Sequence, residues 1–325
     1  MYSLFAIVAL TGMVGSQLAA PVNSFLPAAD FEARDPQPPS LVDPLVVTLP
    51  DGENATGWLA VPLDGEPRAL VVMCHAFGAR AVDFTPFMEE LARAGAVVVA
   101  MEYRGPVGSF NIQAGVDDTV AATRLVLDRF PSIETTTIYG FSMGGAVAGL
   151  TIATMPPDTF DYWIAGAAVV NLTALWQDVE TFRPLIEDET GGTPLEVPAE
   201  YARRSPLLSA REIADANLTA VVMVHAHADP VVSFKQAETL HAELARARVP
   251  TLLVAIGGSQ APWACSKLDP VCAANPWATI DSHFVGHVPA ISPLIVGLLE
   301  GEWKPATDTL EVEGNDLSLL RRLVP

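Results

Sequence analysis

The sequence predicts an α/β protein with a mostly parallel central sheet flanked by helices, and three observations lead to that prediction. Short apolar runs alternate with longer helical patterns along most of the chain. Runs such as residues 69–74 and 96–101 hold no charged side chain, which is typical of strands covered on both faces. Hydrophobic residues make up 50% of the 325 positions, which is enough for a large core. Alternation of this kind builds a parallel sheet between two helical layers.

The elements follow in a regular order. Residues 45–49 and 56–61 flank the turn-forming pair Asp51-Gly52 and predict a hairpin. The later apolar runs predict strands over residues 69–74, 96–101, 136–139, 164–170, 220–225 and 251–256. The helical patterns between and after these runs cover residues 84–94, 116–130, 144–154, 234–248 and 291–299. We therefore expect one α/β domain over residues 45–300, followed by a tail over 301–325.

Two insertions interrupt the alternation. Residues 171–219 separate two predicted core strands by far more than such connections usually need, and they include Trp176 and Phe182 among scattered acidic residues. We interpret this segment as a cap over the site. Residues 257–286 form a second insertion, which carries Cys265 and Cys272.

The amino-terminal segment predicts export. The first charged side chain is Asp30, and the apolar stretch over residues 4–14 has the length of a signal-peptide core rather than a membrane span. We expect residues 1–20 to be a signal peptide or an N-terminal anchor, and residues 21–44 to be a proline-rich linker. The protein is then secreted or exported, and no integral membrane partner is predicted.

Charge and cysteine content narrow the function further. The chain holds 18 Lys and Arg against 38 Asp and Glu, so its formal net charge is -20 and a nucleic acid is excluded as a partner. Cys74 falls in a predicted buried strand, where a thiol is inert. Cys265 and Cys272 stand close enough in sequence for a disulfide, which suits an exported protein. Two free thiols are the alternative.

The motif G-x-S-x-G over residues 140–144 points to nucleophilic catalysis. A predicted strand precedes it and a helix of small residues follows it, which is the strand, sharp turn and helix that present a serine hydroxyl. The flanking glycines let the helix and strand pass closely. Ser142 is the predicted nucleophile.

A serine hydroxyl needs a histidine base and a carboxylate that orients the base. Asp229 follows the strand over residues 220–225 and is the predicted acid, because ligands bind at the carboxyl ends of such strands. The base is His287 or His283, and we favour His287 because Gly286 lets the chain turn inward just before the final helix. His225 and His227 form an H-x-H pair that we interpret as packing or loop residues. We predict no metal and no cofactor.

The chain resembles the α/β-hydrolase superfamily in the order serine, acid, histidine and in this turn around the serine. Within it, residues 225–232 resemble the H-G-x-x-D-x-x-V acid loop of dienelactone-hydrolase and prolyl-oligopeptidase-like serine esterases, as residues 102–105 and 203–207 resemble their R-G turn and R-S-P-L segment. A developing oxyanion needs two backbone N–H donors, and Met143 directly after the serine supplies one. The resemblance implies that Phe77 supplies the other. Ala76 and Ala226 stand where these families usually have glycine.

These observations predict a serine hydrolase that cleaves carboxylic esters through an acyl-enzyme intermediate, with a small-molecule ester as substrate. A serine peptidase of the same fold is the nearest alternative. A non-catalytic binding protein that retains the fold is a second alternative, although all three members of a triad are available.

Overall fold

The protein is described by a computed structural model over residues 41–257, 283, 288–300, 303, 305 and 307–313. These residues form a nine-stranded sheet of order β1-β2-β4-β3-β5-β6-β7-β8-β9. The strands are β1 (Leu41–Thr48), β2 (Asn54–Val61), β3 (Ala69–Cys74), β4 (Ala96–Met101), β5 (Thr135–Phe141), β6 (Tyr162–Gly166), β7 (Ala220–Ala226), β8 (Thr251–Gly257) and β9 (Asp308–Glu313). β2 is antiparallel to both its neighbours, and every other neighbouring pair is parallel. The prediction of a mostly parallel central sheet is confirmed.

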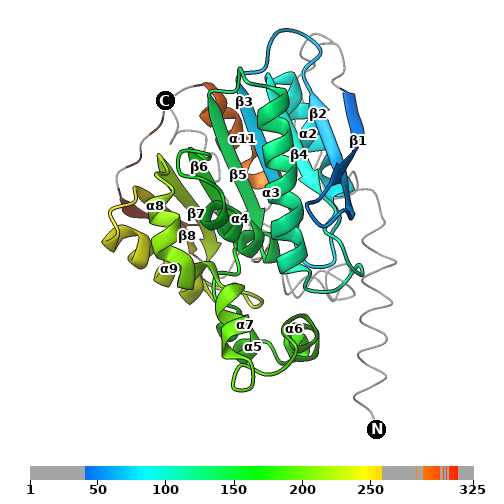
Figure 1. The fold of residues 1–325 in the computed structure, drawn as a ribbon. Helices are drawn as coiled ribbons and strands as arrows, with labels where there is room; N and C mark the ends of the chain where they lie inside the picture. The colour runs from blue at the N-terminus through cyan, green and yellow to red at the C-terminus, as the bar shows by residue number, and fades with distance from the viewer. Residues whose placement is uncertain are drawn as a thin grey trace, which may run out of the picture.

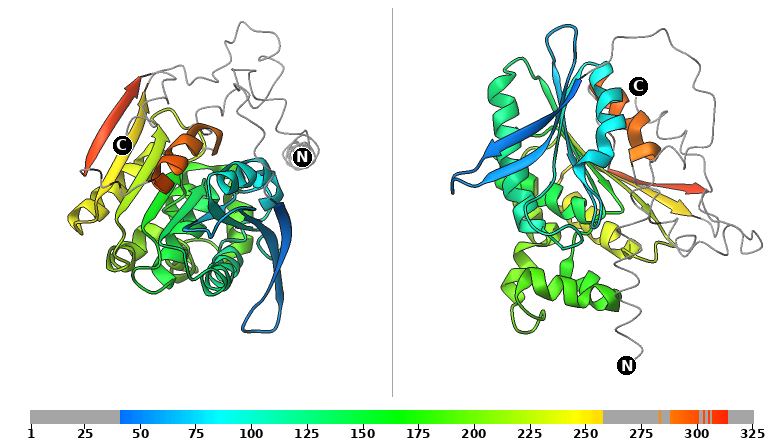
Figure 2. Two further views of the ribbon diagram at one scale, coloured as in Figure 1. Left: turned by 90° about the horizontal axis from the view of Figure 1, so that it is seen from above. Right: turned by 90° about the vertical axis from the view of Figure 1, so that its right-hand side faces the viewer.

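Helices cover both faces of the sheet (Figures 1 and 2). One layer contains α3 (Ile112–Arg129), α4 (Met143–Thr154), α8 (Ala210–Asp215) and α9 (Phe234–Arg246). The other layer contains α2 (Thr85–Arg93), preceded by the 3-10 helix η2 (Ala81–Phe84), and α11 (Val288–Glu300). The helices leave the carboxyl ends of the parallel strands free to carry functional loops.

Each face of the sheet has its own hydrophobic core. In β3, Leu70 and Val72 pack with the first helical layer, whereas Val71 and Met73 pack with the second. All four side chains are buried, because neighbouring residues of a strand point to opposite faces and both faces are covered. The uninterrupted apolar runs in the sequence follow from this burial on both sides.

The predicted cap segment divides into two parts. α5 (Leu172–Asp178), the 3-10 helix η3 (Glu180–Phe182), α6 (Arg183–Thr190) and α7 (Pro198–Arg203) extend below the sheet in Figure 1, and we call them the cap helices. After the short 3-10 helix η4 (Pro206–Ser209), α8 returns to the helical layer and packs between α4 and α9. The cap is therefore smaller than residues 171–219, and the rest of that segment is an ordinary crossover between β6 and β7.

Both ends of the predicted domain differ from the described strands. β1 already includes Leu41, four residues before the predicted start at residue 45, and Pro44 pairs with Trp58 inside it. A proline is tolerated there because β1 is an edge strand, whose outward groups need no ladder partner. The predicted tail over residues 301–325 contains β9, which pairs with β8. Leu310 and Val312 alternate with polar residues, as expected of a strand with one covered face.

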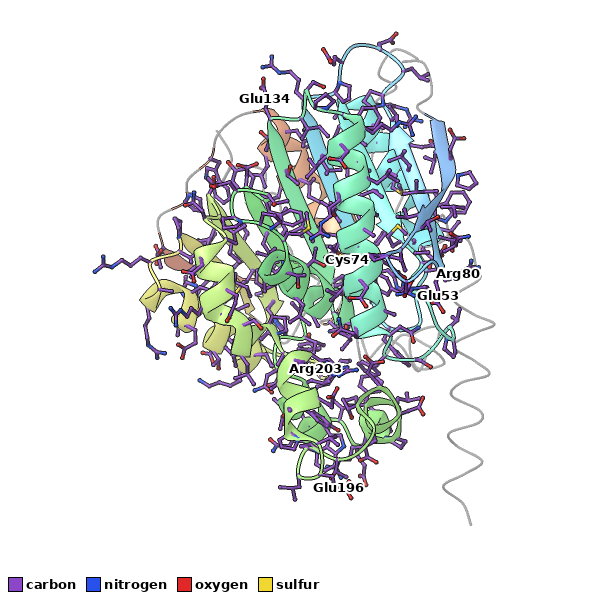
Figure 3. All side chains as sticks on the ribbon, in the orientation of Figure 1. Glu53, Cys74, Arg80, Glu134, Glu196 and Arg203 are labelled. Atoms are coloured by element: carbon purple, nitrogen blue, oxygen red, sulfur yellow. The ribbon has the colours of Figure 1, made fainter. Side chains whose placement is uncertain are left out.

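Several predictions fall on residues outside the described ranges. The leader over residues 1–20, most of the linker over 21–44, and the pair Cys265 and Cys272 lie there, so export and the disulfide stay predictions. Within the described ranges, no helix is long and apolar enough to cross a membrane. Cys74 lies in the middle of the domain (Figure 3), where burial raises the pKa of its thiol to about 12. A thiol with that pKa stays protonated at neutral pH and is not a competing nucleophile.

Candidate active site

Ser142 stands at the sharp turn between β5 and α4. Its backbone has φ of 54° and ψ of -120°, a conformation that residues other than glycine rarely adopt. Its backbone N–H donates to the Gly166 carbonyl at 2.9 Å, and its carbonyl accepts from Gly145 and Val169 at 2.9 Å each. These three bonds hold a strained turn of the kind that positions a nucleophile.

The glycines of the motif are required by close backbone contacts. A Cβ on Gly140 would lie 2.2 Å from the Gly144 carbonyl oxygen. A Cβ on Gly144 would lie 2.1 Å from the carbonyl oxygen of Cys74, at the end of the neighbouring strand β3. Because both obstacles are backbone atoms, a side chain at either position would push α4 away from the sheet. The G-x-S-x-G pattern thus follows from how closely α4 approaches β3 and β5.

Ser142, His283 and Asp229 form a hydrogen-bonded chain. His283 Nε2 lies 3.0 Å from Ser142 Oγ, and His283 Nδ1 lies 2.8 Å from Asp229 Oδ2. A carboxylate only accepts, so Nδ1 carries the proton and Nε2 is left to accept the serine hydroxyl proton. All three side chains are buried. The geometry is that of a nucleophile, its base and the group that orients the base.

The predicted preference for His287 over His283 was wrong. The structure places His283 between the serine and the acid, where one ring nitrogen contacts Ser142 and the other contacts Asp229. The His283 ring also lies 5.0 Å from that of Phe141, the residue before the serine. His287 itself lies outside the described residues. The two histidines stand four positions apart in the sequence between β8 and α11, and the residue pattern does not determine which of them reaches the serine.

Both carboxylate oxygens of Asp229 have hydrogen-bond donors beside them. Oδ1 accepts from the backbone N–H groups of Val231 and Val232 at 2.8 and 3.0 Å. Oδ2 accepts from His283 and lies 3.2 Å from His225 Nε2. Burial acts to raise the pKa of Asp229, but the hydrogen bonds from His225 and His283 outweigh it, so the pKa lies well below its ordinary value. Asp229 is therefore ionised at neutral pH and can stabilise a protonated His283.

The two predicted oxyanion donors lie next to the serine in sequence and on the loop after β3. Met143 is the first residue of α4, and the first N–H groups of a helix have no carbonyl partner inside it. Phe77 stands in a turn in which Gly78 has φ of 73° and Ala79 N–H donates to the Ala76 carbonyl at 3.2 Å. Ala76 does not have a positive φ, so alanine fits there without backbone strain. The assignment of both donors stays a prediction.

Three phenylalanine rings connect the loop after β3 to the cap helices. The Phe77 ring stacks on Phe110 at a centroid distance of 4.9 Å, and Phe182 contacts both rings at 5.4 and 5.5 Å. Phe110 is buried, whereas Phe77 and Phe182 are partly exposed. An apolar cluster therefore borders the residue that is predicted to supply an oxyanion donor. The sequence placed Phe182 in the predicted cap but gave no sign of its two partners.

The cap helices are tied to the domain at their base. Gln236 of α9 accepts from the backbone N–H groups of Val170 and Asn171 through one carbonyl oxygen, at 2.9 Å each. Leu172 N–H donates to Ser205 Oγ at 3.0 Å, which joins the segment entering the cap to the segment leaving it. Sequence reasoning missed these bonds, because Gln236 lies in a helix far from the cap in sequence.

The segments that resemble family motifs are structural supports. Arg104 donates from its backbone N–H and its Nε to the buried carboxylate of Asp118 in α3, at 2.8 and 2.7 Å. Arg204 is buried and pairs with Glu189 and Glu200 at 2.7 Å each. The first arginine fixes the chain after β4, and the second holds α7 against α6. Figure 3 shows Glu196 and Arg203 at the cap, away from the sheet.

The H-x-H pair belongs to no group of potential metal ligands within the described residues. In the described part of the chain, no three His, Cys, Asp or Glu side chains are grouped so that they could hold a metal ion. His225 is buried beside Asp229, and His227 is half-exposed with its Nε2 3.0 Å from Glu311. The two histidines therefore have different surroundings despite their spacing of two.

Comparisons with known proteins show which family the chain matches. The model of the prolyl oligopeptidase family matches residues 84–260, which is more than half of the chain. A protein of Bacillus subtilis strain 168 named uncharacterized peptidase YtmA is 29% identical over 167 residues, which are 50% of this chain and 63% of that protein.

Solved structures share the fold at low sequence identity. Acylaminoacyl peptidase of Pyrococcus horikoshii matches with a TM-score of 0.62 and 15% identity over 87% of this chain and 44% of that chain. A puromycin-hydrolyzing peptidase of Mycobacterium tuberculosis matches with a TM-score of 0.62 and 17% identity over 85% of this chain and 41% of that chain. Dipeptidyl peptidase 4 of Porphyromonas gingivalis matches with a TM-score of 0.53 and 21% identity over 67% of this chain and 32% of that chain. The chain thus spans less than half the length of these structures.

Proposed function

Because the chain belongs to the prolyl oligopeptidase family of serine hydrolases, we propose that it is a serine peptidase that hydrolyses short peptides through an acyl-enzyme intermediate on Ser142. The observation that carries the proposal is the position of His283, 3.0 Å from the serine oxygen and 2.8 Å from the Asp229 carboxylate. A neutral imidazole in that position removes the hydroxyl proton as the oxygen attacks a carbonyl carbon.

The proposed reaction has two acyl transfers. In the first, Ser142 Oγ bonds to the substrate carbonyl carbon, its proton passes to His283 Nε2, and the carbonyl oxygen becomes an oxyanion held by the Met143 and Phe77 N–H groups. The carbon–nitrogen bond then breaks, and His283 returns the proton to the departing amine. In the second, His283 deprotonates a water as its oxygen attacks the acyl carbon. The bond between that carbon and Ser142 Oγ then breaks, and His283 returns the proton to Oγ. Asp229 stays ionised and stabilises the imidazolium in both.

The sequence predicted carboxylic esters as substrates, whereas we propose that the protein cleaves peptide bonds. The matching family is a peptidase family, and the Bacillus subtilis relative is named a peptidase. The chemistry is compatible with amides, because an amide nitrogen leaves only when it is protonated and His283 Nε2 is placed to supply that proton. An ester has a better leaving group and needs this step less. Amide cleavage is thus the more demanding test of the arrangement.

The apolar cluster of Phe77, Phe110 and Phe182 supports a preference for an apolar or aromatic side chain on the acyl side of the cleaved bond. Phe77 carries both a ring of this cluster and a predicted oxyanion donor, so a substrate whose carbonyl lies on that donor has its adjoining side chain near the rings. Each buried methylene of such a side chain contributes about 0.8 kcal/mol.

A matched pair of substrates tests the proposal. A peptidyl p-nitroanilide and a p-nitrophenyl ester with the same acyl group differ only in the bond that is broken. We expect the purified protein to turn over both, the anilide activity to vanish in Ser142→Ala, and a fluorophosphonate probe to label the wild type but not the variant. Turnover of the ester alone would return the function to an esterase. Absence of both turnover and labelling would favour a non-catalytic protein.

A further inference from the structure

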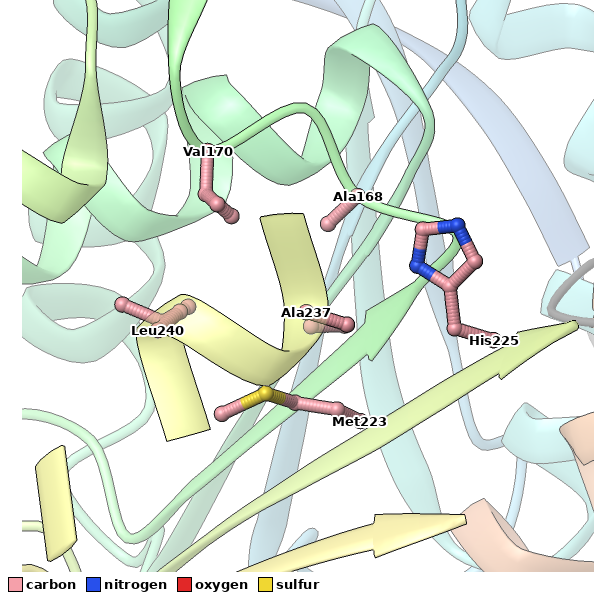
Figure 4. Close-up of a pocket in the computed structure, with 7 residues that line it drawn as sticks. Ala168, Val170, Met223, His225, Ala237 and Leu240 are labelled. Carbon is pink, nitrogen blue, oxygen red and sulfur yellow. The ribbon is translucent and has the colours of Figure 1, made fainter. Parts of the chain in front are cut away.

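His225 is a buried histidine that the proposed mechanism does not use. It lies at the carboxyl end of β7, is 1% exposed, and its ring borders a small pocket lined by apolar side chains (Figure 4). Ala168, Val170 and Ala237 are among those side chains. A polar ring is expensive to bury against such a lining unless its polar atoms are satisfied.

The neighbours of His225 fix its tautomer. Nε2 lies 2.8 Å from the Val232 carbonyl oxygen and 3.2 Å from Asp229 Oδ2. A carbonyl and an ionised carboxylate only accept hydrogen bonds, so Nε2 must carry the proton that both share. His225 is therefore a donor to the acid of the triad, on the same Oδ2 that His283 contacts.

The shared proton joins two residues of the loop between β7 and α9. Val232 N–H also donates back to Asp229 Oδ1 at 3.0 Å. Oδ2 receives His225 and His283, and Oδ1 receives the two loop amides. With four donors on two oxygens, the carboxylate plane is fixed, and the direction in which Oδ2 faces His283 is fixed with it.

We propose that His225 is a positioning residue, which orients the Asp229 carboxylate toward His283 by sharing its Nε2 proton between Asp229 Oδ2 and the Val232 carbonyl. The proposal rests on the proposed function, because it concerns the acid of that triad. His227, two residues further on, pairs with the exposed Glu311 on β9 and has no such role. His225 is the first residue of the segment that resembles the H-G-x-x-D-x-x-V loop, so this segment supplies both the aspartate and a histidine that acts through it.

Four variants test the role of the shared proton. His225→Leu removes the donor and adds an apolar side chain beside an apolar pocket. His225→Asn retains an amide donor on a side chain too short to place it where Nε2 stands, and His225→Gln reaches that position. His227→Leu is the matched control at the half-exposed member of the pair. Each is assayed for kcat and KM on the peptidyl p-nitroanilide and for thermal unfolding.

We expect His225→Leu and His225→Asn to lower kcat on the order of 100-fold with KM changed less than about twofold, because a misplaced base slows the chemical step without weakening substrate binding. His225→Gln should recover most of kcat, and His227→Leu should match the wild type. The downfield proton resonance of His283 Nδ1 should shift in the Leu and Asn variants and return in the Gln variant.

Two results would overturn the positioning role. One is a folded Leu or Asn variant with full kcat, and the other is a pair of variants that do not fold, which would make His225 a requirement for folding alone. The Ser142→Ala variant keeps the two proposals apart. If its activity persists, the triad itself is wrong, whereas activity that depends on Ser142 but not on His225 refutes only the inference made here.

Discussion

His283 Nε2 lies 3.0 Å from Ser142 Oγ although 141 positions separate the two residues in the chain. The serine reaches this point on a strained turn after β5, and the histidine comes from the segment between β8 and α11. Their meeting at the carboxyl end of the sheet places a buried hydroxyl in hydrogen-bond contact with an imidazole nitrogen, the arrangement that activates a serine nucleophile.

The first prediction ranks the two histidines of the loop before α11. His283→Ala should reduce hydrolysis of a peptidyl p-nitroanilide almost to the level of Ser142→Ala, because it removes the only group seen to contact both the serine and the acid within the described residues. His287→Ala is the paired variant and should retain substantial turnover. The opposite ranking, measured as kcat/KM, would return the base to His287.

The second prediction concerns the acid. Asp229→Asn should lower kcat by a factor on the order of 10⁴, because an amide in place of the carboxylate no longer favours the Nδ1–H tautomer of His283. KM should change little. An increase in KM with unchanged kcat would mean that Asp229 binds substrate and does not orient the base.

The same residue gives a pH dependence of stability. The pKa of Asp229 is lower in the folded protein than in the unfolded chain, so the folded state binds fewer protons in the acid range. Its contribution to the free energy of unfolding is therefore present above the ordinary aspartate pKa and is lost as the pH falls through the folded-state value. Denaturation curves of the wild type and Asp229→Asn should converge as the pH falls below about 4. A gap that stays constant down to strongly acid pH would contradict the shift.

The third prediction concerns the cap helices. Phe182→Ala removes one ring of the apolar cluster and should shift the preferred acyl side chain, measured as kcat/KM over peptide anilides of graded size. Phe182→Leu should shift it less. Leu195→Ala is the control, because Leu195 lies in the cap segment and is 95% exposed. An unchanged preference in Phe182→Ala would remove the cluster from the substrate site.

The fourth prediction concerns the turn around the serine. Gly144→Ala places a methyl group 2.1 Å from a backbone oxygen of β3, so it should destabilise the fold by more than the roughly 1–3 kcal/mol of ordinary overpacking. Gly257→Ala is the matched control, since its Cβ would meet its nearest neighbour, the Val312 carbonyl oxygen, at 3.7 Å. Thermal unfolding of both variants measures the difference. A Gly144→Ala protein as stable as the control would show that α4 can move away from the sheet.

Local patterns predicted the parts of the site that local geometry determines. The turn at Ser142 needs glycines at fixed offsets because backbones meet there, so its motif is visible in the sequence. Asp229 lies three residues after the end of the buried strand β7 and was found in the same way. The parallel sheet was predictable because strands covered on both faces leave uninterrupted apolar runs.

Contacts between distant segments were not predictable. The choice between His283 and His287 depends on how a long segment returns to the sheet, and the glycine before His287 was a misleading local signal. The role of His225 depends on a carbonyl seven positions away that lies beside Asp229 only after the loop has folded. β9 pairs at the edge of the sheet after a helix, so its short alternating pattern was interpreted as a tail.

Hydrolysis of a peptidyl p-nitroanilide by the wild type and by Ser142→Ala tests the proposed mechanism most directly. Alanine fits the turn, because the replaced side chain loses only its hydroxyl, so the variant should fold as the wild type does in thermal unfolding. We predict that kcat falls by a factor on the order of 10⁶, to the background of the assay. Turnover by a folded Ser142→Ala protein equal to that of the wild type would contradict the assignment of Ser142 as the nucleophile.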